Sequence, residues 1–196
     1  MNTTEKLAGV ADIYLGQTFR EKAEATNSNS GIRLIQIKDI REGEMLGTDI
    51  LPYAEIEPSK LKVKLTGGEI LLPLRGTRTA AMIFRKSHIP EDVTTTNQVA
   101  IISPKDSSVK LEFLHWYFNS SIGRKALDAI RTGVTIPNIS IKNLSEIIIP
   151  LPNTDVQNKI IKLYNAWNSQ KAVLHGLLSN GEKLADAAFL KIINGD

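Results

Sequence analysis

The stretch LSEIIIPLPNTDVQNKIIKLYNAW, residues 144–167, divides the chain into two parts of different composition. Its first nine residues, 144–152, form a short apolar run ended by two prolines, which predicts a buried strand. Asn153-Thr154-Asp155 then offers a helix N-cap, and no proline follows to the end of the chain. The pattern predicts a globular domain over 1–152 and a long helix over 153–196.

The predicted helix carries an apolar heptad seam. With Ile160 taken as position a, seven of the ten a and d positions are apolar. They are Ile160, Leu163, Trp167, Leu174, Leu177, Leu184 and Ala188. A helix of about 35 residues extends roughly 50 Å, more than a domain of this size can cover, so the seam predicts a coiled coil with another helix. The alternative is a break into a hairpin at Asn180-Gly181, which is a stop signal.

Before this boundary the chain shows short apolar runs separated by turn residues, which are typical of strands. The predicted strands are 32–40, 60–65, 69–74, 80–84 and 99–103. In KLKVKL, residues 60–65, leucine and valine alternate with Lys60, Lys62 and Lys64, which predicts one apolar and one basic face.

Two helices interrupt the strands. Apolar residues at helical spacing predict one helix over 110–120 and a second over 122–130, with a break near Gly123. Strands and helices do not alternate regularly, so the fold class is α+β. We expect a globular mixed α/β domain followed by a long C-terminal coiled-coil helix.

Length and composition restrict the class of protein. The 196 residues, 42% of them apolar, allow one full domain with an appendage. The absence of cysteine excludes disulfides, thiolate zinc sites and a cysteine nucleophile. No apolar stretch approaches the roughly 18 residues that span a bilayer, and the first residues do not resemble a secretory leader. We therefore expect a soluble, cytoplasmic protein that does not bind membranes.

Basic charge is concentrated in one part of the sequence. The net charge is only +3, but residues 60–86 contain seven bases against one acid, whereas residues 39–57 contain six acids against one base. Such a basic segment can bind nucleic acid. The alternative is an ordinary solvated face.

The turn RGTRT, residues 75–79, is the most informative local feature. It places two arginines and two threonines on a glycine turn between apolar strands. Arginine can bind guanine through two hydrogen bonds, and hydroxyl groups suit phosphate oxygens. An ordinary polar hairpin loop is the competing interpretation. The candidate DNA-binding residues are Gln17, Lys38, Lys60, Lys62, Lys64, Arg75, Thr77, Arg78, Thr79, Asn97, Gln98 and Arg131.

The sequence lacks catalytic signatures. It contains no GxxxxGK[ST] loop, no GxGxxG after a strand, no HExxH and no GxSxG. The histidines are scattered, and His115, within FLHWYF, is expected to be packed or hydrogen-bonded in the core. We therefore expect no catalytic residues, no metal site and no cofactor.

The order of motifs resembles the target recognition domain of the specificity subunit of type I restriction–modification systems. The matching segments are LAGVADIYLGQTF, GIRLIQIKDIREGEM, LKVKLTGGEILLPLRGTRTAAMIF, LEFLHWYFNSSIGRKAL, GVTIPNISIKNLSEIIIPLP and DVQNKIIKLYNAW. The last two, a strand ending in IPLP followed by a glutamine-bearing long helix, are the most specific. The resemblance spans nearly the whole chain.

The resemblance implies a non-catalytic subunit that reads double-stranded DNA. In that family each recognition domain reads half of a bipartite sequence, and long helices space the domains and bind adenine-methylating modification subunits, which a restriction subunit joins. A usual member has two recognition domains and two helices, whereas this chain has one of each. We therefore expect two copies to pair their helices antiparallel and to read an inverted repeat.

Two other functions compete with this interpretation. The first is an incomplete specificity fragment that acts only as a protein-interaction module. The second is a small nuclease or methyltransferase, and the absence of an [DN]PP[FYW] motif counts against the methyltransferase. The DNA target does not follow from the sequence, because recognition domains of one fold read different bases through a few loop side chains.

Overall fold

The computed structural model describes residues 3–25, 27, 30–42, 51–77, 80–86 and 89–195. The chain divides into two compact units, Met1–Gln157 and Asn158–Asp196, which are described separately. The mixed α/β architecture of the first unit and a long C-terminal helix confirm the predicted fold class.

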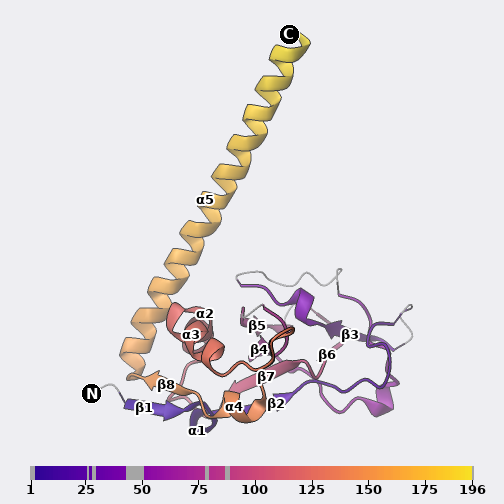
Figure 1. Cartoon of the computed structure of the whole chain (residues 1–196), viewed down its shortest axis with the longest axis vertical. Helices are drawn as coiled ribbons and strands as arrows, with labels where there is room; N and C mark the ends of the chain where they lie inside the picture. The colour runs from indigo at the N-terminus through magenta and orange to yellow at the C-terminus, as the bar shows by residue number, and fades with distance from the viewer. Residues whose placement is uncertain are drawn as a thin grey trace. The chain divides into compact units, whose positions relative to one another are not determined.

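A four-stranded antiparallel sheet is the centre of the first unit (Figure 1). Its order is β2 (Ala11–Leu15), β7 (Val99–Pro104), β4 (Glu69–Pro73) and β5 (Met82–Phe84). All five residues of β4 are buried. A strand that is covered on both faces reads as a continuous apolar run instead of an alternating one, which explains the sequence EILLP.

Two smaller sheets complete the strands. β3 (Ile32–Ile35) pairs in parallel with β6 (Asp92–Thr95), and β1 (Thr3–Lys6) pairs antiparallel with β8 (Ile148–Leu151). The main core cluster includes residues of the central sheet and of the β3–β6 pair, so the two sheets share one core. Its fully buried members are Ile35, Ile40, Leu65, Leu71, Val93, Val99 and Ile101.

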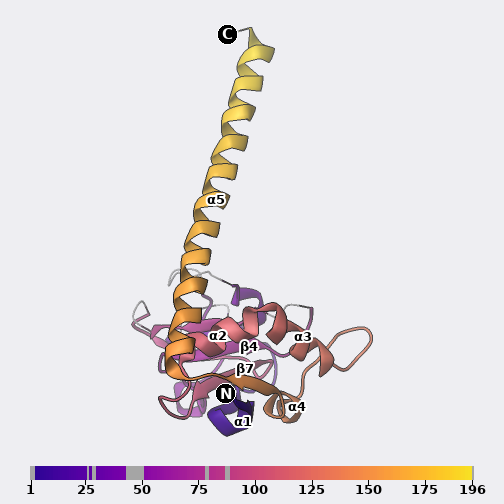
Figure 2. The same cartoon turned by 90° about the vertical axis from the view of Figure 1, so that its left-hand side faces the viewer.

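Short helices cover the central sheet. α2 (Leu111–Asn119) contacts β4 and β5, and α1 (Leu7–Val10) and α4 (Ile141–Ser145) contact β2. Figure 2 shows α2 and α3 (Ser121–Ala129) on one side of the sheet and α1 and α4 on the other.

The two predicted helices are confirmed, but the break between them lies at Ser120. The Ser120 hydroxyl oxygen accepts a hydrogen bond from the Gly123 amide nitrogen at 3.2 Å and so caps α3. A Cβ atom at Gly123 would lie 1.9 Å from the carbonyl oxygen of Tyr117. The glycine is therefore required by the close contact between the two helices.

α5 (Thr154–Asn194) begins where the sequence predicts. The Asn153 Oδ1 accepts a hydrogen bond from the Val156 amide nitrogen at 3.0 Å, as an N-cap does. The helix continues for 41 residues through Asn180-Gly181, so the hairpin alternative is wrong. None of the described helices is long and apolar enough to cross a lipid bilayer.

The second unit is part of this single helix, and its seam is exposed. Leu163 and Leu184 are each 74% exposed, and Leu177 is 64% exposed. Within the unit no second described element covers these side chains.

Gln157 attaches the first turn of α5 to the first unit. Its Oε1 accepts a hydrogen bond from the Lys110 amide nitrogen at 2.9 Å, and its Nε2 donates to the carbonyl oxygens of Ser108 and Pro152 at 2.8 and 2.9 Å. The side chain is fully buried. The compact unit therefore extends five residues past the predicted boundary at Pro152.

Several predicted strands have different limits. The run 32–40 is a strand only to Ile35 and continues as a 3₁₀ turn, Ile37–Asp39. The run 144–152 is divided between α4 and β8. Apolar runs do not mark where backbone pairing stops, because a core-facing turn requires the same residues. Strands β1, β2 and β6 were not predicted.

The prediction of a strand over 60–65 is wrong. Residues 58–60 form a 3₁₀ turn, and the segment that follows is extended but outside any sheet. Side chains supply part of its pairing: the amide nitrogens of Lys62 and Val63 donate to Gln17 Oε1, and the Val63 carbonyl accepts from the Thr94 hydroxyl. The alternation of faces is nevertheless present, with Leu65 buried and Lys62 exposed.

Candidate DNA-binding end of the sheet

The antiparallel sheet brings three polar turns to one end. Leu15 of β2 lies opposite Ala100, and Pro73 of β4 lies opposite Val99, so the last residues of β2 and β4 flank the first residues of β7. The residues that follow or precede these strand ends are therefore neighbours. They are Gln17, Arg75, Thr77, Asn97 and Gln98, which we call the polar end of the sheet.

Backbone hydrogen bonds hold the polar end together. The Leu74 amide nitrogen donates to the Gln98 carbonyl oxygen at 2.9 Å, and the Asn97 amide nitrogen donates to the Gln17 carbonyl oxygen at 3.0 Å. Gly16 permits this approach, because a Cβ atom there would lie 2.3 Å from the carbonyl oxygen of Thr96. Three segments far apart in the sequence are thus fixed side by side. The side chains of Arg75, Asn97 and Gln98 are exposed.

A further loop, Thr132–Asn138, is joined to this end. The Gly76 amide nitrogen donates to the Pro137 carbonyl oxygen at 2.9 Å, and Arg75 and Asn138 form an isolated antiparallel bridge. None of its residues was among the predicted DNA-binding residues. The sequence signal of this loop is a cluster of glycine, threonine, proline and asparagine without an apolar period, which is typical of turns.

Gln17 holds the basic segment against the polar end. Its side-chain Oε1 accepts from the amide nitrogens of Lys62 at 2.9 Å and Val63 at 3.3 Å, and the residue is only 6% exposed. Its Nε2 donates to the Thr18 carbonyl oxygen at 3.3 Å. The described contacts of Gln17 position the backbone of its neighbours, and direct contact with DNA stays a prediction for this residue.

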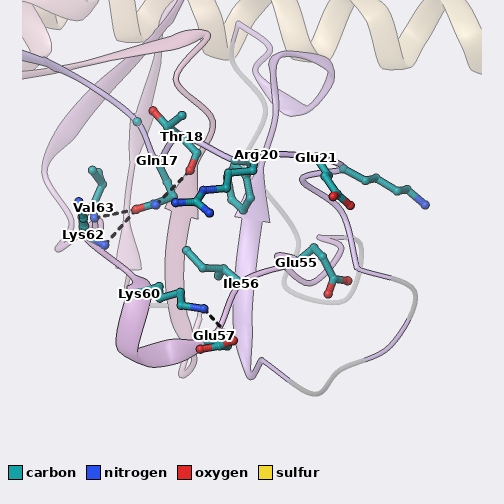
Figure 3. Close-up of a pocket in the computed structure, with 13 residues that line it drawn as sticks. Gln17, Thr18, Arg20, Glu21, Glu55, Ile56, Glu57, Lys60, Lys62 and Val63 are labelled. Carbon is teal, nitrogen blue, oxygen red and sulfur yellow. Dashed lines mark hydrogen bonds and ion pairs between the residues drawn. The ribbon is translucent and has the colours of Figure 1, made fainter.

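An open hollow of about 980 Å³ lies beside Gln17 (Figure 3). Its lining contains four bases and three acids, which are Arg20, Lys22, Lys60, Lys62, Glu21, Glu55 and Glu57. Figure 3 shows the Arg20 side chain directed toward Gln17. Arg20 was not among the predicted residues, because nothing near it in the sequence distinguishes it from other surface arginines.

Ion pairs separate the predicted bases into two groups. Four bases of residues 60–86 have acidic partners: Lys60 with Glu57 at 2.9 Å, Lys64 and Lys86 with Asp92 at 2.6 and 3.8 Å, and Arg85 with Glu112 at 3.3 Å. Lys62 and Arg75 are exposed and form no ion pair with any acid in the part of the chain that the structure describes. The side chains of these two basic residues are available to contact the phosphates or the nucleobases of DNA.

The other predicted residues have different surroundings. Lys38 forms an ion pair with Glu24 at 3.1 Å. Hydrogen bonds from Lys38 and from Gln36 lower the pKa of the Glu24 carboxyl. Arg131, half-buried, lies 3.4 Å from Asp128 and directly precedes the loop at Thr132. Lys64 pairs at the first residue of β6, away from the polar end. Arg78 and Thr79 lie outside the described residues.

His115 is a half-buried histidine with hydrogen-bond partners, as predicted. Its Nε2 lies 3.0 Å from the Nδ2 of Asn119, and burial lowers its pKa below the ordinary 6.5. Asn119 is itself buried and forms two hydrogen bonds, each 2.9 Å long, with the backbone of Ala81. Among the described residues, no group of three histidine, aspartate or glutamate side chains could hold a metal ion.

The sequence and the fold are those of a DNA-specificity domain. The family model of the type I restriction modification DNA specificity domain matches residues 2–170, and the chain belongs to this family. Members of this family specify a DNA sequence and are not catalytic, in agreement with the expectation from the motifs.

Individual relatives are distant. The chain is 24% identical over 173 residues to the EcoBI type I restriction enzyme specificity subunit of Escherichia coli, and the match covers 85% of this chain and 35% of that subunit. The solved S subunit from M. genitalium is 16% identical, with a TM-score of 0.58 over 99% of this chain and 46% of that one. The HsdS subunit from Thermoanaerobacter tengcongensis is 20% identical, with a TM-score of 0.61 over 88% and 38%. The chain thus spans less than half the length of these relatives.

Proposed function

We propose that this chain is the DNA-reading subunit of a type I restriction–modification complex and that it reads one half-site of a bipartite sequence. The observation that carries the proposal is the position of Lys62 and Arg75. Both are exposed, and both are without an ionic partner among the described residues. Arg75 belongs to the polar end, and the backbone of Lys62 is bonded to Gln17 of the polar end.

The two basic side chains suit different parts of a DNA duplex. Arg75 lies on a turn whose backbone is held by the hydrogen bond from Gly76 to Pro137 and by the bridge to Asn138, and its planar guanidinium can donate two hydrogen bonds to guanine in the major groove. Lys62 lies on the extended segment held by Gln17, where a single flexible charge suits a phosphate. Phosphate contacts give affinity and register, and base contacts give specificity.

Pairing of two copies would supply the second half-site. The exposed seam of α5, with Leu163, Leu177 and Leu184 on one heptad face, supports an antiparallel homodimer through this helix. A two-fold axis would relate the two readers, so the target would be an inverted repeat with a fixed spacer.

The remaining partners follow from the same proposal. The assembled complex would contain adenine-methylating modification subunits and a restriction subunit, and it would act on DNA in the cytoplasm. This chain would contribute neither a cofactor site nor catalytic residues.

Methylation-sensitive sequencing tests the proposal. DNA from cells that carry this chain together with its modification subunits is expected to show adenine methylation at one inverted-repeat motif, which disappears when the chain is deleted. An unchanged methylation pattern after deletion would contradict the proposal. An asymmetric motif would contradict the homodimer but not the reading function.

A protein-interaction module without DNA reading is the second candidate, and the exposed seam is compatible with it. In that case the chain would bind modification subunits and would retain no DNA sequence selectively.

A further inference from the structure

We infer that the loop Thr132–Asn138 reads bases and that Val134, at its tip, contacts the C5-methyl group of a thymine in the major groove. The inference rests on the proposed DNA-reading function and adds a specificity-determining residue to it. Figure 2 shows the loop between α3 and α4 standing out from the rest of the first unit.

The loop is closed and rigid. Thr132 and Asn138 exchange two backbone hydrogen bonds, of 2.9 and 2.8 Å, across its base. Gly133 has a φ of 93°, which other residues rarely adopt, and a Cβ atom there would lie 2.8 Å from the Ile136 carbonyl oxygen. The proline after Ile136 restricts that residue to extended conformations. A loop fixed in this way loses little conformational entropy when it binds.

The loop is also held beside the turn that carries Arg75. The Ile139 amide nitrogen donates to the Leu74 carbonyl oxygen at 2.8 Å, and the Gly76 amide nitrogen donates to the Pro137 carbonyl oxygen at 2.9 Å. These bonds join the second strand of the loop base, residues 137–139, to the residues that follow β4. A molecule that binds at the Arg75 turn therefore also lies close to this loop.

The tip presents methyl groups to solvent. Val134 is 103% exposed and Ile136 is 49% exposed, so neither side chain contributes fully to the core. The tip, Gly133–Pro137, contains no charged side chain and therefore provides no ionic contact to phosphate. In the major groove the apolar feature of a base edge is the thymine methyl group, and short aliphatic side chains contact it. The exposed, basic side chain of Arg75 on the turn bonded to this loop makes DNA the partner that fits this surface.

Selection from random DNA duplexes tests the inference. The full chain, assembled with its modification subunits, is compared with Val134→Ser and with Ile148→Thr as control. Ile148 is 54% exposed, but it lies in β8 opposite Lys6, outside the polar end. Val134→Ser is expected to lose a thymine preference at one position of each half-site and about tenfold in affinity, as for the loss of two buried methyl groups. Its salt dependence should stay unchanged, and the control should behave as the wild type.

Uracil supplies the complementary measurement. Replacing the selected thymine with uracil removes only the methyl group, so it should weaken the wild type about as much as Val134→Ser does and should not weaken that variant further. Two results would overturn the inference: the same motif and affinity for Val134→Ser, or loss of binding to the modification subunits, which would make the loop a protein-docking element. If the wild type selects no sequence, the proposed DNA-reading function fails and the inference fails with it.

Discussion

The Lys62 amide nitrogen donates a hydrogen bond to the side-chain Oε1 of Gln17, 2.9 Å away, although 45 residues separate the two in the sequence. The bond replaces a strand-to-strand bond in a segment that belongs to no sheet. A buried glutamine thereby fixes the backbone that carries an exposed lysine. The relationship means that the position of a candidate phosphate contact depends on a buried side chain.

Gln17→Leu is expected to release this segment. The substitution leaves the amide groups of Lys62 and Val63 without their acceptor, which should lower the free energy of unfolding by about 1–3 kcal/mol. Urea unfolding measures this loss. Gln17→Glu, which keeps an acceptor oxygen, should lose less. An equal loss of unfolding free energy in both variants would show that the acceptor oxygen of residue 17 does not contribute to stability.

Lys62→Ala should weaken binding to all DNA sequences alike. If Lys62 contacts a phosphate, the slope of log K against log salt concentration should decrease by about one. Lys64→Ala is the matched control, because Lys64 is already paired with Asp92. If the salt dependence of DNA binding decreased more in Lys64→Ala than in Lys62→Ala, the assignment of Lys62 as a phosphate contact would be contradicted.

Arg75→Ala should relax specificity. Loss of a base-contacting arginine costs about 1–3 kcal/mol at the recognised base pair, and the preference at that position should disappear in a binding selection. Arg85→Ala, which removes an arginine paired with Glu112, should leave the motif unchanged. An unaltered motif and affinity in Arg75→Ala would exclude Arg75 from base reading.

Leu177→Lys should prevent pairing through α5. Leu177 occupies a d position of the seam, and a charge buried in a coiled-coil interface is strongly unfavourable. Light scattering should give the dimer mass for the wild type and half that mass for the variant. Ala172→Lys, on the outward f position, adds the same charge and should stay dimeric. A monomeric wild type would contradict the homodimer directly.

His115 should make stability depend on pH. Burial lowers its pKa below 6.5, so the unfolded chain binds the proton more tightly than the folded chain. Its contribution to stability is therefore complete above pH 6.5 and is lost as the pH falls below that value. His115→Gln should unfold with a smaller difference between about pH 7.5 and about pH 5.5 than the wild type. The same difference in both proteins would assign the pH dependence to other groups.

The sequence predicted the long elements well because their signals are local. The N-cap at Asn153, the helices either side of Ser120 and the central strand EILLP all follow from spacing and turn residues within one window. The extended segment after Lys60 was mistaken for a strand because alternation reports which face is buried, not what the backbone bonds to.

The candidate site was predicted in part. Arg75, Asn97 and Gln98 were chosen as loop residues, and the structure brings them to one end of the sheet. Their convergence depends on strand order, which local patterns do not specify. Val134 gave no signal, because a valine in a sequence is normally expected to be buried.

The backbone bonds at the polar end have a consequence for how such a chain can acquire a new target. The turns at 75–77 and 97–98 and the loop at 132–138 are each anchored through main-chain hydrogen bonds, to which the Thr132 hydroxyl adds one bond to the Asn138 carbonyl oxygen at 3.3 Å. The other side chains of these segments can therefore be exchanged while the backbone keeps its pairing. Retargeting this protein becomes a problem of transplanting three short segments, with Gly16, Gly76 and Gly133 left in place.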